Sequence, residues 1–102
     1  DGQRFAFHGY LPAKDAERSK VLRDLEKESR QKRQTQLCIE TPYRNAALFD
    51  ALLRHCQPGT RLCVATDLSL PSEHIRTQTI AAWKKQTPPD LERRPTVFLF
   101  LA

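Results

Sequence analysis

The sequence predicts an α/β domain with a mixed sheet of about five strands and two main helices packed on it. Strand-like and helix-like segments alternate along most of the chain, and glycine and proline fall at the boundaries between them. With 102 residues, the chain is long enough for one domain around a single modest core. A composition of 39% hydrophobic and 28% charged residues is that of a globular protein, and Gly and Pro are too few for collagen-like or low-complexity classes.

Five segments have the short apolar or alternating pattern of strands. They lie at residues 4–10, 35–40, 60–67, 73–79 and 96–101. The segment 60–67 has a nearly continuous apolar centre, which is typical of an interior strand covered on both faces. No predicted helix separates it from 73–79, so we expect these two strands to pair antiparallel and to make the sheet a mixed one.

Two longer segments are predicted to be helices. The first covers residues 15–34 with Asp15 as its N-cap, and its apolar stripe is so thin that it should bury one edge only. The second begins at Thr41, stops before Pro58 and should be buried more deeply. Its apolar residues recur at helical spacing: Leu48, Phe49, Leu52, Leu53 and Cys56. A short helix at residues 80–86 precedes the last strand.

Basic residues outnumber acidic ones by 17 to 12, and many of them lie on the first predicted helix. Acidic residues are interleaved with them, which is more typical of a solvated helix face than of a nucleic-acid-binding surface. Lys14 and Arg18 differ from the rest because they lie at the junction of a strand and this helix, where a ligand can bind. These two are the candidate substrate-binding residues.

The three cysteines, at positions 38, 56 and 63, match no metal-ligand spacing, so no metal site is predicted. They fall in or at the end of apolar segments, which predicts buried thiols in a reducing compartment, the cytoplasm. The longest apolar run, residues 97–102, is far shorter than the roughly 20 residues of a membrane-spanning helix.

Acidic residues lie at two predicted strand ends, where ligands of open α/β sheets bind. Glu40 is equally typical of a ligand contact and of a brace for the next turn, whereas Asp67 is more typical of a loop cap. Arg44 lies in the turn before a helix, where its guanidinium and free backbone N–H groups can hold an anion. The alternative is that Arg44 pairs with Glu40 and locks the turn. No nucleophile and base are recognisable together, so no catalytic residue is predicted.

Two segments together resemble a known methyltransferase family. Residues 7–14, Phe-His-Gly-Tyr-Leu-Pro-Ala-Lys, with Arg18 after them, are similar to the family pattern F-x-G-[FY]-L-P-x-K…R. Residues 39–44, Ile-Glu-Thr-Pro-Tyr-Arg, are similar to its pattern Y-E-x-P-H-R. The family is that of the tetrapyrrole-methylase-like (class III) S-adenosylmethionine-dependent methyltransferases, in the branch of the ribosomal RNA small-subunit methyltransferase I. The resemblance extends over essentially the whole chain and corresponds to the C-terminal half of these proteins.

The resemblance implies that residues 1–102 are the C-terminal domain of a two-domain enzyme, whose N-terminal cofactor-loop domain is absent from this chain. The absence of Met and the start at Asp1 agree with a piece of a longer protein. S-adenosyl-L-methionine is implied to lie in the cleft between the domains of a cytoplasmic homodimer, and this chain alone should be inactive. The implied cofactor contacts are Ile39, Glu40, Thr41, Arg44, Pro95 and Thr96.

The chain departs from the RNA-modifying branch at several positions. Ile39 replaces a Tyr, Tyr43 replaces a His, and residues 66–70, Thr-Asp-Leu-Ser-Leu, lack the Arg and Lys of the pattern R-E-L-T-K. Those charges suit a phosphate-rich substrate, so the methyl acceptor is left open between RNA and a tetrapyrrole or other small molecule. The alternatives are a ribosomal RNA 2'-O-ribose methyltransferase domain and a non-enzymatic basic RNA-binding or dimerisation module.

Overall fold

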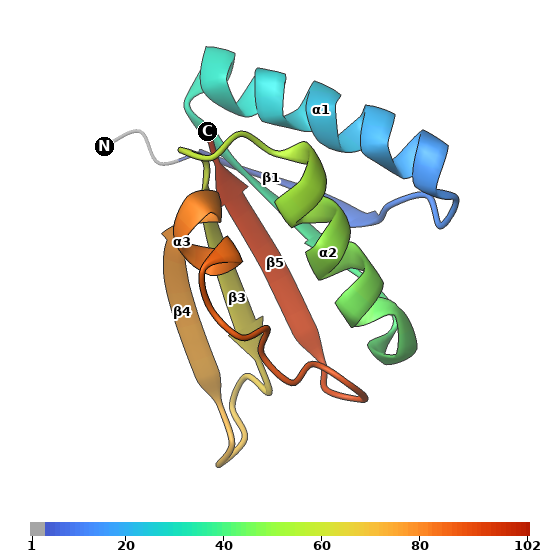
Figure 1. Cartoon of the computed structure of the whole chain (residues 1–102), viewed down its shortest axis with the longest axis vertical. Coiled ribbons are helices and arrows are strands. Elements are labelled where there is room, and N and C mark those ends of the chain that lie inside the picture. The colour runs from blue at the N-terminus through green and yellow to red at the C-terminus, as the bar shows by residue number, and fades with distance from the viewer. Residues whose placement is uncertain (1–3) are drawn as a thin grey trace.

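The computed structural model describes residues 4–102 and contains the expected five-stranded mixed sheet, with strand order β1-β2-β5-β3-β4 (Figure 1). The strands are β1 (Arg4–Tyr10), β2 (Gln34–Ile39), β3 (Arg61–Thr66), β4 (His74–Thr79) and β5 (Thr96–Leu101). The helices are α1 (Asp15–Lys32), α2 (Asn45–His55) and α3 (Ile80–Lys84), with a short 3-10 helix η1 (Pro42–Arg44) before α2. Only β1 and β2 pair parallel, and the pairs β2–β5, β5–β3 and β3–β4 are antiparallel. The predicted fold class is confirmed.

Helix α1 begins where predicted, but the prediction that Asp15 caps it is wrong. Lys14 occupies the N-cap position without a side-chain cap. The Asp15 carboxylate instead accepts a hydrogen bond from Arg54 at 3.1 Å and lies 3.6 Å from the Arg18 guanidinium. The helix ends at Lys32, because Arg33 takes a left-handed conformation with φ of 51°. No helix among residues 4–102 is both long and apolar enough to cross a membrane.

The second helix is divided at its start. Pro42 to Arg44 form one turn of 3-10 helix, and α2 proper begins at Asn45. The deep burial expected for this helix is confirmed, since Leu48 and Leu52 are both fully buried. Among the hydrophobic residues of α1 only Leu22 is buried to that extent, as its thin apolar stripe predicts.

All three helices pack on one face of the sheet, where the hydrophobic core lies (Figure 1). Phe98 and Phe100 of β5 are buried at its centre. The Phe49 and Trp83 rings meet edge to face at 5.4 Å, and the Trp83 indole N–H donates to the Leu62 carbonyl at 2.9 Å. These contacts fasten the short helix α3 onto β3 and α2.

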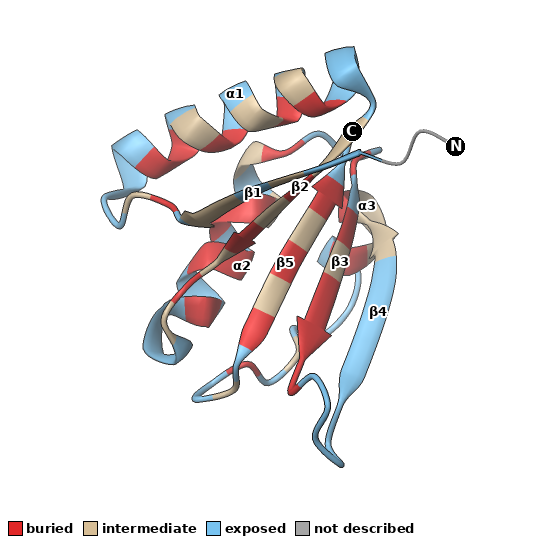
Figure 2. Ribbon diagram, turned by 180° about the vertical axis from the view of Figure 1, so that it is seen from behind, coloured by how far each residue is buried: buried red, intermediate tan, exposed pale blue. Residues whose placement is uncertain are grey.

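The other face of the sheet, called the open face below, carries no helix among residues 4–102. The view from behind shows the strands β5, β3 and β4 in front, with buried and intermediate residues alternating along β5 (Figure 2). The prediction that the third strand is covered on both faces is therefore wrong within this chain: Leu62 and Val64 are buried beneath the helices, but Cys63 on the other face is only half-buried. Cys63 is correspondingly not the buried thiol that the sequence predicts.

Candidate functional site

A hollow of about 320 Å³ opens at the edge of the sheet where β1 and β2 end and β5 begins. The chain segments that wall it are far apart in the sequence, and the antiparallel pairing of β2 with β5 brings them together. Its lining consists of Tyr10, Ile39, Glu40, Pro42, Leu68, Pro95, Thr96 and Val97. Four of the six implied cofactor contacts, namely Ile39, Glu40, Pro95 and Thr96, thus lie around a single hollow.

Glu40 combines the two roles that the sequence left open. Glu40 is buried, and one of its carboxylate oxygens accepts a hydrogen bond from the N–H of Thr41 at 2.8 Å. This hydrogen bond braces the turn into η1. The other oxygen accepts no hydrogen bond from any group of residues 4–102, and Glu40 belongs to the lining of the hollow. One oxygen is therefore committed to the turn, and the other is open to a donor in the hollow.

The structure does not bring Arg44 into this hollow. Its side chain is exposed, and within the described residues it forms no ion pair with Glu40, so the predicted alternative of a locking pair is not observed. The neighbouring Tyr43 is 80% exposed, and the Arg93 guanidinium lies 5.9 Å from the centre of its ring. Thr41 is half-buried beside the hollow but outside its lining.

The two candidate substrate-binding residues also lie outside the hollow. Lys14 is exposed at the start of α1. Arg18 is buried, with its guanidinium 3.6 Å from Asp15 and its Nε without a hydrogen-bond partner. Of the two, Lys14 is the one presented to solvent, and the role of both in substrate binding stays a prediction.

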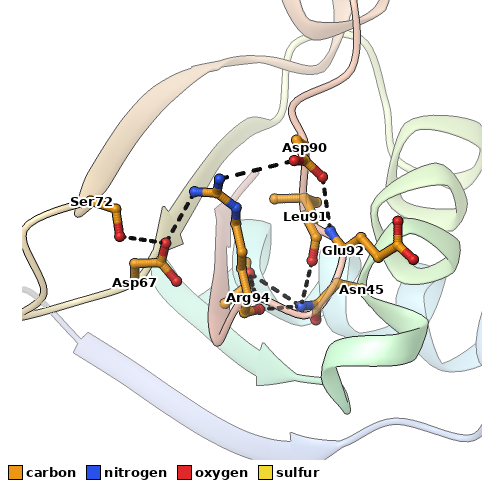
Figure 3. Close-up of polar contacts among 8 residues, drawn as sticks. Asn45, Asp67, Ser72, Asp90, Leu91, Glu92 and Arg94 are labelled. Carbon is orange, nitrogen blue, oxygen red and sulfur yellow. Dashed lines mark hydrogen bonds and ion pairs between the residues drawn. The ribbon is translucent and has the colours of Figure 1, made fainter.

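Polar contacts on the helix-covered side hold the start of β5, which forms one wall of the hollow (Figure 3). Asp67, which is buried and has a φ of 55°, accepts hydrogen bonds from the Ser72 hydroxyl at 2.9 Å and from Arg94 at 3.1 Å. Its own N–H donates to the Pro95 carbonyl at 2.9 Å. The expectation that Asp67 braces the following loop is confirmed, and the same contacts tie that loop to the start of β5.

Asn45 is a residue that the sequence analysis missed. It is fully buried at the first position of α2, and its side-chain amide donates to the Arg94 carbonyl at 2.6 Å (Figure 3). The same amide donates to the Thr96 hydroxyl at 3.2 Å. Asn45 therefore fixes the Pro95–Thr96 wall of the hollow against α2. The only signal in the sequence is a polar residue at the start of an otherwise apolar helical stripe.

The other hollows are lined by none of the predicted site residues. A larger hollow of about 470 Å³ lies beside α3 and β4, lined among others by His74, Arg76 and Trp83. Burial, together with the nearby Glu40 and Glu26 carboxylates respectively, raises the pKa of Cys38 and of Cys56 to about 12, so both thiols stay protonated. Within residues 4–102, no three His, Cys, Asp or Glu side chains are grouped to hold a metal ion.

Comparisons with known proteins identify the fold. No protein-family model matches the sequence, and no curated protein matches it. The crystal structure of the methyltransferase CobJ is similar, with a TM-score of 0.61 and 16% sequence identity over 98% of this chain and 41% of that one. A uroporphyrin-III C-methyl transferase from Thermus thermophilus, solved with S-adenyl homocysteine, gives a TM-score of 0.49 at 16% identity over 99% of this chain and 43% of that one. The chain has the fold of about two-fifths of the CobJ structure.

Proposed function

We propose that this chain is the C-terminal domain of an S-adenosylmethionine-dependent methyltransferase, and that the hollow at the end of β2 holds part of the cofactor. The observation that carries the proposal is the gathering of Ile39 and Glu40 with Pro95 and Thr96 around one hollow. The sequence resemblance implies these same residues as cofactor contacts, although they lie at the ends of different strands. The similarity to a methyltransferase fold supports the class of enzyme.

The lining of the hollow suits part of a nucleoside-sized ligand. Small-molecule pockets usually have volumes of about 300–1,000 Å³, so a hollow of about 320 Å³ is enough for a portion of the cofactor. Tyr10, Leu68 and Val97 supply apolar walls, and the open carboxylate oxygen of Glu40 can accept a hydrogen bond from an ammonium or hydroxyl group. The rest of the cofactor would be held by the N-terminal domain that the resemblance implies.

The chemistry proposed for this domain is positioning. S-adenosylmethionine supplies an activated methyl group, and transfer to an acceptor depends mainly on alignment of the acceptor with that group. Glu40 and the strand ends would fix the cofactor, and Asn45 would keep the Thr96 wall in place. The acceptor is a tetrapyrrole, another small molecule or RNA, with the exposed Lys14 as a candidate contact for its negative charges. We expect the full-length enzyme to act in the cytoplasm and this chain alone to transfer no methyl group.

A calorimetric titration with S-adenosylmethionine tests the proposal. Leu68 lines the hollow and is 45% exposed, so Leu68→Trp should fill the hollow without disturbing the core. Leu70 is 50% exposed in the same loop but outside the lining, and Leu70→Trp is the matched control. We expect Leu68→Trp to weaken cofactor binding at least about tenfold, because the larger side chain fills the space of the cofactor. Leu70→Trp should leave cofactor binding unchanged. Equal affinities in the two variants would contradict the proposal.

A further inference from the structure

A hollow between the two main helices contains no residue of the proposed cofactor site. It has a volume of about 500 Å³ and lies where the C-terminal end of α2 meets the second half of α1 (Figure 1). We call it the basic hollow, because three of the six side chains in its lining are cations. The lining consists of Arg23, Glu26, Lys27, Arg30, His55 and Gln57.

The helical repeat of α1 separates charges that alternate in the sequence. Arg23, Lys27 and Arg30 recur at spacings of four and three residues, so they lie on one face of the helix. Asp24 and Glu28 each follow a cation by one residue, which places them about 100° further around the helix. The interleaving of acidic and basic residues therefore does not neutralise the face of α1 that lines the basic hollow.

The three cations of the basic hollow have no acidic partner in the fold. All three are exposed, and none of them forms an ion pair with any group of residues 4–102. Other cations of the two helices do form such pairs, namely Arg18, Lys32 and Arg54. Like charges three and four residues apart destabilise a helix, so this arrangement costs the fold stability. An anion bound in the hollow would relieve the repulsion.

The one acidic residue of the basic hollow is engaged by the fold itself. Glu26 is buried, and one of its carboxylate oxygens accepts hydrogen bonds from the Gln57 N–H at 2.7 Å and from the Thr60 hydroxyl. These bonds join α1 to the segment between α2 and β3. Glu26 balances one of the three cations, so the lining keeps two positive charges in excess.

Two neutral side chains add further donors to the same lining. His55 is half-buried at the end of α2, and its Nε2 is buried without a hydrogen-bond partner among residues 4–102. The side chain of Gln57 is exposed, and only its backbone N–H is used by Glu26. Imidazole and amide groups both donate hydrogen bonds to oxyanions. A bound oxyanion would therefore supply the partner that the His55 ring lacks in the fold.

We propose that the basic hollow binds a chain of phosphate groups. Arg23 and Arg30 are seven residues apart, a rise of about 10 Å along the helix, so the cations are spread over more than a single phosphate. Arginine holds phosphate oxygens with its planar fork of donors, and Lys27 adds a point charge between the two arginines. The lining contains no aromatic residue on which a base could stack, so the group recognised is the phosphate. An oligophosphate and the backbone of a nucleic-acid strand share this chemistry, and the experiment below separates them.

The basic hollow is separate from the proposed cofactor site. Helix α2 begins at Asn45, which holds the Thr96 wall of the cofactor hollow, and ends at His55 in the basic hollow. The 11 residues of α2 put about 16 Å between these two ends. No residue lines both hollows, and phosphate binding does not require S-adenosylmethionine. A failure of either proposal is therefore visible independently of the other.

Titrations of this chain with two probes at about 50 mM salt test the proposal. The first probe is sodium tripolyphosphate, followed by calorimetry, and the second is a labelled single-stranded oligonucleotide, followed by fluorescence anisotropy. We expect a dissociation constant of about 100 µM or lower for at least one of them. Tripolyphosphate alone would identify a free oligophosphate as the ligand, and the oligonucleotide alone would identify a nucleic-acid backbone. If both bind, tripolyphosphate should displace the oligonucleotide.

Two outcomes of these titrations would overturn the proposal. One is that neither probe binds. The other is that an oligonucleotide with an uncharged methylphosphonate backbone binds as tightly as the charged strand, because recognition would then not depend on phosphate charge.

A pair of double variants assigns the binding to the basic hollow. Arg23→Gln with Lys27→Gln removes two exposed cations of the lining and should weaken binding at least about tenfold. Lys84→Gln with Lys85→Gln removes the same charge from exposed positions outside the hollow, and should keep the affinity within about threefold. For the oligonucleotide, three phosphate contacts predict a slope of about −2 for the logarithm of affinity against that of salt concentration, falling to about −0.7 in the first variant. Equal affinities and equal slopes in the two double variants would overturn the assignment.

Discussion

Two phenylalanines in neighbouring parts of one sheet have opposite environments. Phe100 of β5 is 1% exposed beneath the helices, whereas Phe7 of β1 is 67% exposed on the open face. Phe7 pairs with Leu37 on one face of the sheet and Phe100 pairs with Gln36 on the other, so their burial is decided by the face on which each lies. The helices α1, α2 and α3 all cross on the same side of the sheet, and they bury the residues of one face only. The comparison teaches that an apolar pattern predicts the burial of a sheet face but does not identify the segment that buries it.

The largest difference is expected for the same truncation on the two faces. Phe100→Ala should lower the free energy of unfolding by about 3–5 kcal/mol, because it leaves a cavity in the core. Phe7→Ala should change it by no more than about 0.5 kcal/mol in dilute, monomeric protein, because water already surrounds the ring. Urea denaturation of both variants measures the difference. Similar losses would show that the open face is already packed in the single chain.

The second prediction compares the thiols buried on the covered side with the thiol on the open face, at alkaline pH. The pKa of Cys38 and of Cys56 is raised to about 12 in the folded chain, while the pKa of an unfolded thiol is about 8.5. The folded state thus binds more protons, and its stability is complete below about pH 8.5 and falls as the pH rises toward about 12. Each thiol should remove up to about 1.4 kcal/mol per pH unit in this window.

Chemical denaturation at several pH values checks this prediction. The double variant Cys38→Ala with Cys56→Ala should show a flatter dependence on pH, because the two thiols on the covered side cause it. Cys63→Ala on the open face is the matched control and should retain the full dependence. An equally steep fall in the double variant would refute the assignment.

A smaller loss of stability is expected when the buried hydrogen bonds of Asn45 on the covered side are removed. Asn45→Ala removes buried hydrogen bonds to the Arg94 carbonyl and the Thr96 hydroxyl, and should cost about 1–3 kcal/mol. Gln86→Ala, which removes an exposed hydrogen-bonded pair with Gln78, should cost no more than about 0.5 kcal/mol. Thermal unfolding compares the two, and an Asn45 variant as stable as the Gln86 variant would argue against a fixed Thr96 wall.

The smallest effect on stability is expected at Arg44. Its side chain is exposed and has no ion pair with Glu40, so Arg44→Ala should change the free energy of unfolding by less than about 0.5 kcal/mol. In the full-length enzyme, Arg44→Ala should leave S-adenosylmethionine binding unchanged, because Arg44 lies outside the lining of the hollow. Calorimetry and a melting curve on the same protein separate these outcomes. A loss of affinity of about tenfold or more in the Arg44 variant would contradict this placement and return the residue to the cofactor site.

The local parts of the fold could be predicted from the sequence, and the errors have identifiable causes. Strand and helix positions follow from hydrophobic periodicity. The third strand is shorter than predicted because Thr60 directs its hydroxyl to Glu26 and Asp67 turns away with a positive φ. The absence of a helix on the open face among residues 4–102 could not be predicted, because the apolar run at residues 60–67 does not show which of its faces the helices cover.

The candidate site was accessible to the sequence only in part. The rule that ligands lie at strand ends singles out Glu40, and the resemblance adds Pro95 and Thr96. The role of Asn45 depends on contacts with a distant segment that only the folded sheet brings near. Arg44 was grouped with these residues because the resemblance implies it and because it lies in the turn before a helix, but the lining of the hollow does not include it.

The central claim is that the hollow at the end of β2 contributes to binding S-adenosylmethionine, and an amide NMR titration of this chain with the cofactor tests it residue by residue. The account predicts concentration-dependent shifts for the amides of Ile39, Glu40, Thr41 and Thr96, with those of His74 and Arg76 beside the larger hollow unmoved. Methionine alone is the control and should cause smaller shifts. Shifts confined to His74 and Arg76, or none at saturating cofactor, would contradict the account.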